Sequence, residues 1–236
     1  MKTKSILTIL MTIVFSVTLF GQVALIGDSW TGYDYSGTKV VGGMAKYFDT
    51  VYGKQGAGLP AIYKRELSKA ITSDNDTIVL IGGLNSWGMK DEDLRDWYIK
   101  FGQVTKDSGK ILYVCEYPSN LRISGGSATI NKINRAINDG ASISGSYKVI
   151  KCEPDKYPRK FISGFHLTQD GYKLFSDNVK LRIAQDRYNA EIELNTQFSG
   201  YISQINSKNV QWLKFPLQPS GNYYSLISAS ISSSIT

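Results

Sequence analysis

A serine and a histidine far apart in the chain have the chemistry of a nucleophile and its base. Ser29 lies in the segment Gly27-Asp28-Ser29-Trp30, directly after a short apolar run, and His166 is the one histidine of the 236 residues. Because imidazole has its ordinary pKa near neutral pH, His166 would have to supply general-base catalysis of the usual kind. A serine hydroxyl held at a tight turn becomes a nucleophile when such a base takes its proton. The pair predicts cleavage of an acyl bond, whereas Gly-Asp-Ser taken alone would also suit an ordinary strand-ending turn.

Two further segments suit the same chemistry. Gly53-Lys-Gln-Gly56 is a glycine-containing loop, and Gly83-Leu-Asn85 follows another apolar run. With the Ser29 segment and the stretch from His166 to Tyr172, they resemble, in the right order, the four signature blocks of the SGNH (GDSL-type) hydrolases. The resemblance covers roughly residues 22 to 187. It implies an α/β fold, with a flavodoxin-like, doubly wound, parallel five-stranded sheet flanked by helices and the site at the carboxyl ends of the strands.

The resemblance also implies a role for each block. Ser29 would form the acyl-enzyme, with His166 as its base. The oxyanion would be bound by the N–H groups of Ser29 and Gly56 and by the side-chain amide of Asn85. Gly58 competes with Gly56 as the glycine donor. The alternative for the whole Gly53–Gly58 segment is a flexible loop without a role in catalysis, and the alternative for Asn85 is a turn residue that caps the following helix. No cofactor is implied, and one histidine with two distant cysteines argues against a metal site.

Ser163 departs from the family pattern, which has an aspartate three residues before the histidine. That acid orients the imidazole and stabilises its protonated form, whereas a serine hydroxyl carries no charge. Three explanations remain open: a Ser-His dyad oriented by Ser163 or a backbone carbonyl, a substitute carboxylate from Glu153 or Asp155, or loss of most catalysis. Asp170 is expected to cap the helix that follows His166.

The elements that must position these residues alternate between strand and helix. Short apolar runs predict five strands, at residues 22–26, 49–52, 77–81, 110–115 and 147–152. Helices are expected at residues 38–48, 61–71, 91–106, 128–138 and 168–188, with Pro60 in a first turn and with Gly109 and Gly140 after helix ends. Five buried strands with interleaved helices predict a doubly wound sheet.

The two ends of the chain differ from this middle part. Residues 1–21 predict a secretory signal peptide, with Lys2 and Lys4 before an apolar stretch, although Leu19 fits a cleavage site poorly. A retained membrane anchor is the alternative. Residues 22–188 would form the hydrolase domain, and residues 189–236 a β-rich or partly disordered extension that could contact another protein. The location expected is secreted or in the cell envelope.

Charge and aromatic residues bear on the substrate. Without Lys2 and Lys4 the chain has 25 basic and 20 acidic residues, with no dense basic cluster, so nucleic acid is not an expected partner. The substrate class is a small-molecule or polysaccharide ester, with an O-acetylated glycan preferred. Four aromatic residues near the blocks could stack on sugars or provide hydrophobic packing at the sheet edge: Trp30, Tyr33, Tyr35 and Trp87. The rival function is a non-catalytic binding or assembly module of the same fold.

Cys115 and Cys152 each end a predicted strand. Export would permit a disulfide between them, but neighbouring parallel strands only sometimes supply its geometry, so two buried thiols are favoured.

Overall fold

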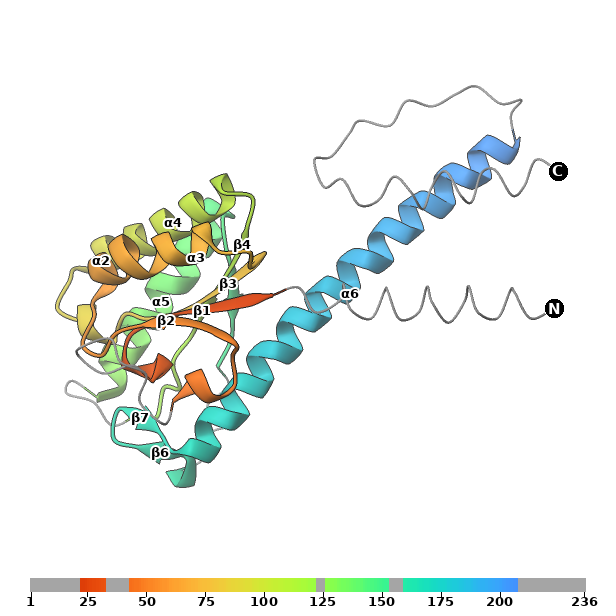
Figure 1. The fold of residues 1–236 in the computed structure, drawn as a ribbon. Helices are drawn as coiled ribbons and strands as arrows, with labels where there is room; N and C mark the ends of the chain where they lie inside the picture. Colours follow the sequence, from red (N-terminus) through yellow and green to blue (C-terminus); the bar gives the residue numbers. More distant parts are fainter. Residues whose placement is uncertain (1–21, 33–42, 122–125, 153–158, 208–236) are drawn as a thin grey trace. The chain divides into compact units, whose positions relative to one another are not determined.

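The apolar runs form a five-stranded sheet in the computed structural model of the chain (Figure 1). The structure describes residues 22–32, 43–121, 126–152 and 159–207. The central strands are apolar and buried, as expected for strands with both faces of a parallel sheet covered. The strands are β1 (Val23–Gly27), β2 (Thr50–Gly53), β3 (Thr77–Ile81), β4 (Ile111–Cys115) and β5 (Lys148–Ile150).

The strands lie in the order β2-β1-β3-β4-β5, and every neighbouring pair is parallel. The chain therefore leaves β1 toward one edge of the sheet and returns past it to β3. In such sheets the loops at the carboxyl ends on either side of the reversal point form the ligand site. The predicted doubly wound α/β fold is confirmed, and the loops after β1, β2 and β3 carry Ser29, Gly56 and Asn85.

Helices cover both faces of the sheet. Figure 1 shows α2 to α5 on one side and the beginning of α6 on the other. α6 buries Tyr172, Phe175, Val179 and Ile183, whose spacing puts them on one helical face. The helices are α2 (Leu59–Ile62), which runs into the π-helical turn η3 (Tyr63–Leu67) and α3 (Ser68–Thr72), then α4 (Asp91–Asp107), α5 (Gly126–Ser144) and α6 (Gln169–Ser207).

Short elements complete the described chain. Four of them lie in the loops: the 3-10 turns η1 (Ser29–Thr31), η2 (Met44–Lys46), η4 (Leu84–Ser86) and η6 (Arg159–Phe161). The hairpin strands β6 (Ile162–Ser163) and β7 (His166–Leu167) pair antiparallel and form a second, two-stranded sheet.

Several local expectations need correction. Gly140 lies inside α5 rather than after its end, because its missing Cβ leaves room for the Tyr147 hydroxyl. Of the helix expected at 38–48, the described residues 43–48 form only the single turn η2. The hydroxyl of Thr168, not Asp170, caps α6, since Thr168 Oγ1 accepts the N–H of Gly171 at 3.3 Å. Asp170 stands in the first turn, where the helix dipole also favours a carboxylate.

The expected β-rich character is absent from residues 189–207, because α6 continues to Ser207. The stretch 197–202, part of the extension expected to be β-rich or partly disordered, is therefore helical. Ala190, Glu191, Glu193 and Leu194 are strong helix formers, and extending a helix costs less than starting one. The chain divides into two compact units, Met1–Tyr188 and Asn189–Thr236, and residues 208–236 lie outside the described part.

Cys115 and Cys152 are both buried thiols with no disulfide between them. Burial raises the pKa of Cys115 far above its ordinary value, so this thiol stays protonated and unreactive. None of the described helices combines the length and apolar character needed to cross a bilayer. The signal peptide expected at residues 1–21 falls outside the described residues.

Candidate active site

Ser29 begins a one-turn helix directly beyond the carboxyl end of β1. The carboxylate of Asp28 caps this turn by accepting the N–H of Trp30 at 3.1 Å, and Thr31 Oγ1 donates to the carbonyl of Asp28 at 2.7 Å. Gly27 is required because a Cβ there would overlap the carbonyl oxygen of Ile81 on the neighbouring strand. The turn is therefore held at both ends, and it leaves Ser29 partly exposed while Asp28 is buried.

His166 reaches the site on a two-residue hairpin loop. Ser163 pairs with His166 across the β6-β7 ladder, and Gly164 at the first loop position has a φ of 65°, the left-handed conformation that short hairpin turns favour. The N–H of Thr168 donates to the carbonyl of Phe161 at 2.8 Å and closes the base of the hairpin.

The fold brings this histidine to the turn that carries Ser29. Ser29 Oγ lies 2.8 Å from His166 Nε2. Burial lowers the pKa of His166 below its ordinary 6.5, so the imidazole is neutral at neutral pH and Nε2 can accept the serine proton. The geometry is that of a nucleophile and its general base.

Asn85 joins the loops that follow β1, β2 and β3. It lies in η4 after β3, and its Nδ2 is 3.4 Å from Asp28 Oδ2 and 3.3 Å from the carbonyl of Ala57. Ala57 directly follows Gly56, which is exposed and has a φ of 71°, a conformation that favours glycine. The side-chain amide of Asn85, the Gly56 loop and the Ser29 turn thus meet at one end of the sheet.

Gly58, the competing donor, has a different local role. It precedes α2, and its carbonyl accepts the N–H groups of Ala61 and Ile62 at 3.0 and 3.1 Å. The hydroxyl of Ser86 accepts the N–H of Leu59 at 2.8 Å and so links this helix start to η4. Gly58 therefore acts at the start of a helix, while Gly56 stands in the exposed loop.

Asp28 is the buried carboxyl group closest to the nucleophile in sequence. Burial raises its pKa from 3.8 to about 7, against the hydrogen bonds from the Trp30 N–H and from Tyr117, which favour the charged form. The Tyr117 hydroxyl lies 3.5 Å from Asp28 Oδ2. Asp28 therefore supports the turn that carries Ser29 by hydrogen bonding, with the N–H of Trp30 as its closest donor.

The imidazole of His166 has no carboxylate partner among the described residues. Ser163 lies beside His166 through backbone pairing, and nothing is described of its side chain. Among the residues that the structure describes, no carboxylate is in hydrogen-bond or ion-pair contact with His166, and burial is the one cause of its pKa shift. Glu153 and Asp155, the expected substitutes, lie outside the described residues.

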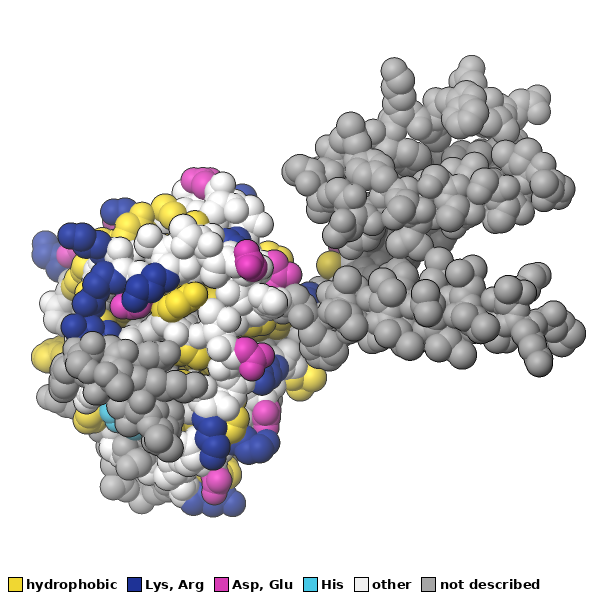
Figure 2. All heavy atoms as spheres, in the orientation of Figure 1, with side chains coloured by type: hydrophobic (Ala, Val, Ile, Leu, Met, Phe, Trp, Pro, Cys, Tyr) yellow, Lys and Arg dark blue, Asp and Glu magenta, His cyan; other side chains and the backbone are white. Residues whose placement is uncertain are grey.

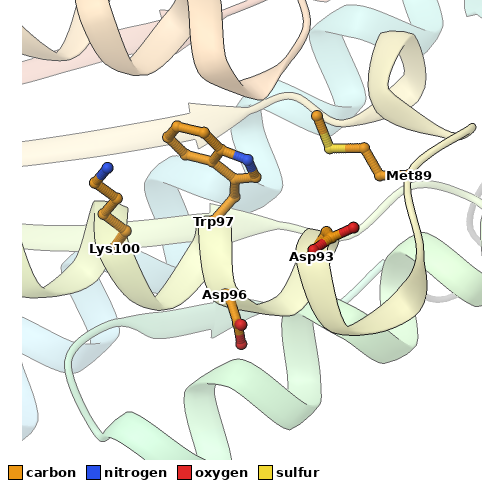
Figure 3. A pocket seen from close by; sticks show the side chains of 5 residues that line it. All are labelled: Met89, Asp93, Asp96, Trp97 and Lys100. Carbon is orange, nitrogen blue, oxygen red and sulfur yellow. The ribbon is translucent and has the colours of Figure 1, made fainter.

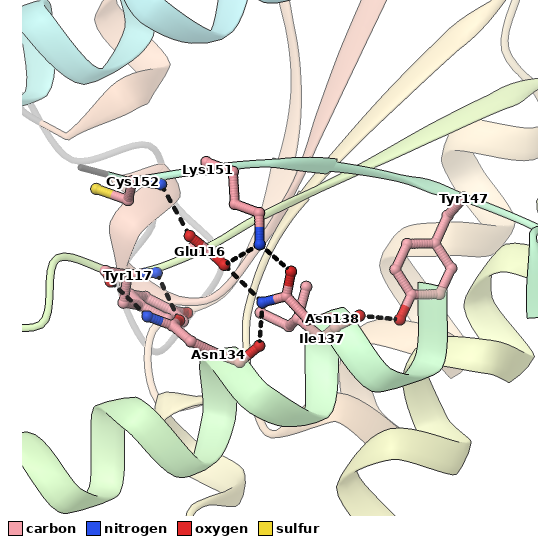
Figure 4. A network of polar contacts seen from close by, with 8 residues as sticks. All are labelled: Glu116, Tyr117, Asn134, Ile137, Asn138, Tyr147, Lys151 and Cys152. Atoms are coloured by element: carbon pink, nitrogen blue, oxygen red, sulfur yellow. Dashed lines mark hydrogen bonds and ion pairs between the residues drawn. The ribbon is translucent and has the colours of Figure 1, made fainter. Parts of the chain in front are cut away.

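Glu116 is a buried carboxylate at the end of β4, but it has other partners (Figure 4). Its Oε2 accepts the N–H of Cys152 at 3.0 Å, and its Oε1 accepts from Asn138 at 2.6 Å and from Lys151 at 3.2 Å. The network ties the ends of β4 and β5 to α5. Sequence reasoning missed it, because nothing in the sequence marks Glu116 as the acid that faces a neighbouring strand end.

A second part of this network supports Tyr117. Asn134 accepts the Tyr117 N–H at 2.9 Å and donates to the Tyr117 carbonyl at 2.8 Å (Figure 4). The two bonds hold the backbone from which the Tyr117 hydroxyl approaches Asp28. α5 thus supports the turn that carries Ser29 through Tyr117 and Asp28.

Trp30 is a core residue, so of its two expected roles, sugar stacking and hydrophobic packing, the packing role is confirmed. It is fully buried, in edge-to-face contact with Tyr117, Tyr172 and Phe175 at centroid distances of 5.0, 5.5 and 5.7 Å. Its indole N–H donates to the carbonyl of Phe165 at 3.1 Å, a contact that sequence reasoning missed.

Two other aromatic side chains remain accessible near these loops. Trp87 and Phe165 are each 53% exposed, and the Phe165 ring lies 4.4 Å from the imidazole of His166, centroid to centroid. Tyr33 and Tyr35 lie outside the described residues.

A shallow pocket lies elsewhere, on α4. Its volume is about 270 Å³, and Figure 3 shows Asp93, Asp96, Trp97 and Lys100 on the helix with Met89 on the preceding loop. Neither Ser29 nor His166 lines it. On the face seen in Figure 2, basic side chains form several separate groups with acidic and apolar side chains between them.

Solved structures of ester hydrolases have a similar fold. A lipase/acylhydrolase from Enterococcus faecalis aligns with 70% of this chain and 96% of its own, at 16% identity and a TM-score of 0.56. The acetyl xylan esterase AlAXEase aligns with 68% of this chain and 98% of its own, at 16% identity and a TM-score of 0.55. A GDSL-like lipase from Bacteroides thetaiotaomicron aligns with 70% and 89%, at 13% identity and a TM-score of 0.53.

Comparison with protein-family models gives no match, and comparison with curated protein sequences gives no significant match. At the identities of the structural neighbours, the likeness establishes the fold. This chain has the five-stranded α/β fold of the SGNH hydrolases, and its structural neighbours include GDSL-type lipases and acylhydrolases.

Proposed function

We propose that the protein is a serine ester hydrolase that forms an acyl-enzyme on Ser29. The observation that carries the proposal is the 2.8 Å contact between Ser29 Oγ and His166 Nε2. The serine lies at the carboxyl end of a central strand, on a turn held by Asp28, and the histidine is neutral where a base must accept a proton.

In the proposed reaction, Ser29 Oγ attacks the ester carbonyl carbon while His166 Nε2 takes the hydroxyl proton. The negative charge that develops on the carbonyl oxygen is stabilised by the N–H groups of Ser29 and Gly56 and by Asn85 Nδ2, donors that can each contribute about 3 kcal/mol. His166 then returns the proton to the leaving alcohol. Water repeats the sequence on the acyl-enzyme and releases the acid.

The proposed substrate is an O-acetylated carbohydrate or envelope glycan. A structural neighbour is an acetyl xylan esterase, and the exposed rings of Trp87 and Phe165 near the site loops offer apolar faces of the kind that contact sugar rings. A signal peptide at residues 1–21 would bring the enzyme to such a substrate. The mass of the protein recovered from a secreting host tests this location, because an intact N-terminus would contradict cleavage.

A non-catalytic module is the second candidate, and Ser163 is the observation that favours it. In a serine protease, neutralising the acid of the triad lowered kcat about 10⁴-fold with the geometry intact. A protein with no acid at this position can keep the fold and the Ser-His contact while it turns over esters very slowly.

Hydrolysis of p-nitrophenyl acetate and labelling by a fluorophosphonate separate the two candidates. We expect turnover and a single labelled serine in the wild type, and neither in Ser29→Ala. Ser68→Ala is the matched control, because Ser68 is exposed at the start of α3. A folded wild type that neither turns over the ester nor takes the label would overturn the enzyme proposal.

A further inference from the structure

Trp30 links the two halves of the candidate site through one hydrogen bond. Its indole Nε1–H donates to the carbonyl oxygen of Phe165 at 3.1 Å. Trp30 directly follows Ser29, and Phe165 directly precedes His166. The bond therefore joins the backbone neighbours of the nucleophile and of the base across 135 residues of chain.

The donor side of this bond is held rigidly. Trp30 has no exposed surface, and its ring meets the rings of Tyr117 and Tyr172 at interplanar angles of 87° and 84°. Tyr117 follows β4 and Tyr172 lies in α6, so the indole is packed between separate parts of the fold. A buried indole N–H needs an acceptor, since leaving it without one costs about 1–3 kcal/mol.

The acceptor, the carbonyl of Phe165, lies on a small hairpin that has few internal contacts to hold it in place. The hairpin that carries His166 has only two residues in each strand, and Phe165 is 53% exposed at its tip. A two-stranded hairpin is marginally stable by itself. Its position against the turn that carries Ser29 must therefore come from contacts with the rest of the protein.

We propose that Trp30 is a positioning residue, whose indole N–H fixes the Gly164-Phe165 loop so that His166 Nε2 faces Ser29 Oγ. The inference rests on the proposed esterase function for its catalytic consequence. In this proposal, the hydrogen bond to the backbone of Phe165 orients His166. In a Ser-His-Asp triad, an acid that is hydrogen-bonded to the imidazole ring has this role.

Trp30→Phe tests this role, because it keeps an aromatic ring and removes the N–H donor. We expect kcat for p-nitrophenyl acetate to fall about 10- to 100-fold with KM little changed, since small misplacements of a catalytic group have effects of this size. Trp97→Phe on α4 is the matched control and should keep the wild-type kcat.

The single histidine supplies a readout that does not depend on turnover. In protein labelled with ¹⁵N-histidine, the ring signals report His166 alone. We expect Trp30→Phe to move the His166 pKa up toward its ordinary value, because a displaced ring regains solvent. Trp97→Phe should leave it at the wild-type value. Wild-type kcat and an unchanged His166 titration in folded Trp30→Phe would overturn the proposal.

The same measurements separate the failure of this proposal from the failure of the proposed function. A wild type without turnover whose His166 titration still shifts in Trp30→Phe would contradict the esterase but support the positioning role. If Trp30→Phe does not fold, the hydrogen exchange rate of the Trp30 indole N–H in the wild type is measured in place of the variant's kcat and titration. The Trp30 signal is assigned by elimination, from the signals lost in Trp87→Phe, Trp97→Phe and Trp212→Phe. Exchange as fast as that of the exposed Trp87 would show that the bond does not hold the hairpin.

Discussion

Ser29 Oγ and His166 Nε2 lie 2.8 Å apart although 137 residues separate them in the chain. The serine is placed by a strand of the main sheet and the histidine by a small hairpin outside it. Their contact is thus a property of how two independent elements pack.

His166→Gln should abolish nearly all turnover, because no second histidine can replace the base. We expect kcat for p-nitrophenyl acetate to fall at least about 10³-fold, as in serine hydrolases that lose their base. Asp170→Asn is the matched control, since Asp170 is exposed in the first turn of α6 and should leave kcat within about twofold. Substantial activity in His166→Gln would mean that another group takes the serine proton.

The pH dependence of the free energy of unfolding should expose the buried carboxyl group of Asp28. Its pKa is about 7 in the folded protein against an ordinary value of 3.8, so the folded state holds more protons between these values. Stability from this group is then fully present below about pH 4 and falls as pH rises toward 7, by roughly 4 kcal/mol in total. Denaturant unfolding across this range should show a weaker decline in Asp28→Asn.

His166 acts in the opposite direction over a window just below its ordinary pKa of 6.5. Its folded pKa is lowered, so the unfolded chain holds more protons there and stability is lost as pH falls. The contribution of His166 to the pH dependence of the free energy of unfolding is the difference between the profile of Asp28→Asn and that of the double variant that also carries His166→Gln. An Asp28→Asn profile identical to that of the wild type would show that Asp28 is not buried in charged form above pH 7.

Restoring the acid with Ser163→Asp should raise turnover, because a carboxylate beside His166 stabilises the protonated imidazole. We expect an increase in kcat of at least about tenfold together with a higher His166 pKa. Ser163→Asn is the control of similar size without charge. No change in kcat or in the His166 titration would argue against any role for position 163.

The substitute carboxylates can be tested in the same series. If Glu153 or Asp155 orients the imidazole, Glu153→Gln or Asp155→Asn should lower kcat sharply, and Ser163→Asp should partly restore it. If neither substitution affects kcat, the site works as a Ser-His dyad.

Gly27→Ala should damage the turn that carries Ser29, because the added Cβ overlaps the carbonyl oxygen of Ile81, a backbone atom that cannot swing aside. We expect a loss of about 2 kcal/mol in the free energy of unfolding and a larger relative loss of turnover. Gly88→Ala is the control, since nothing lies within 4 Å of its Cβ position. Equal stability of the two variants would contradict the close contact between β1 and β3.

Much of the fold could be predicted because it follows from local patterns. Thr77–Ile81 is a strand in both the prediction and the structure, since a short run of mostly β-branched residues, four of them apolar, favours a buried strand. The predictions that Gly140 follows a helix end and that the extension after residue 188 is β-rich were wrong for a related reason. Gly140 lies inside a helix because the Tyr147 hydroxyl packs against it. Residues 197–202 are helical because extending a helix that is already formed costs little.

The candidate site, like the fold, has features that could be predicted from the sequence and features that only packing decides. The sequence alone identifies four candidate residues by their types and by their places after predicted strands or before a predicted helix: Ser29, Gly56, Asn85 and His166. The sequence left open whether Trp30 stacks on a sugar or packs inside the protein, because its burial depends on Tyr117, Tyr172 and Phe175 closing around it from distant parts of the chain.

The sequence by itself determined the alternation of strands and helices and the residue types that could perform acyl transfer, because periodicity and turn chemistry are local. Only the tertiary structure decided that His166 faces Ser29, that Asp28 is buried with a pKa of about 7, and that the Trp30 indole holds the carbonyl of Phe165. Those relationships depend on distances and on solvent exclusion between segments far apart in the chain, and these arise when the elements pack together.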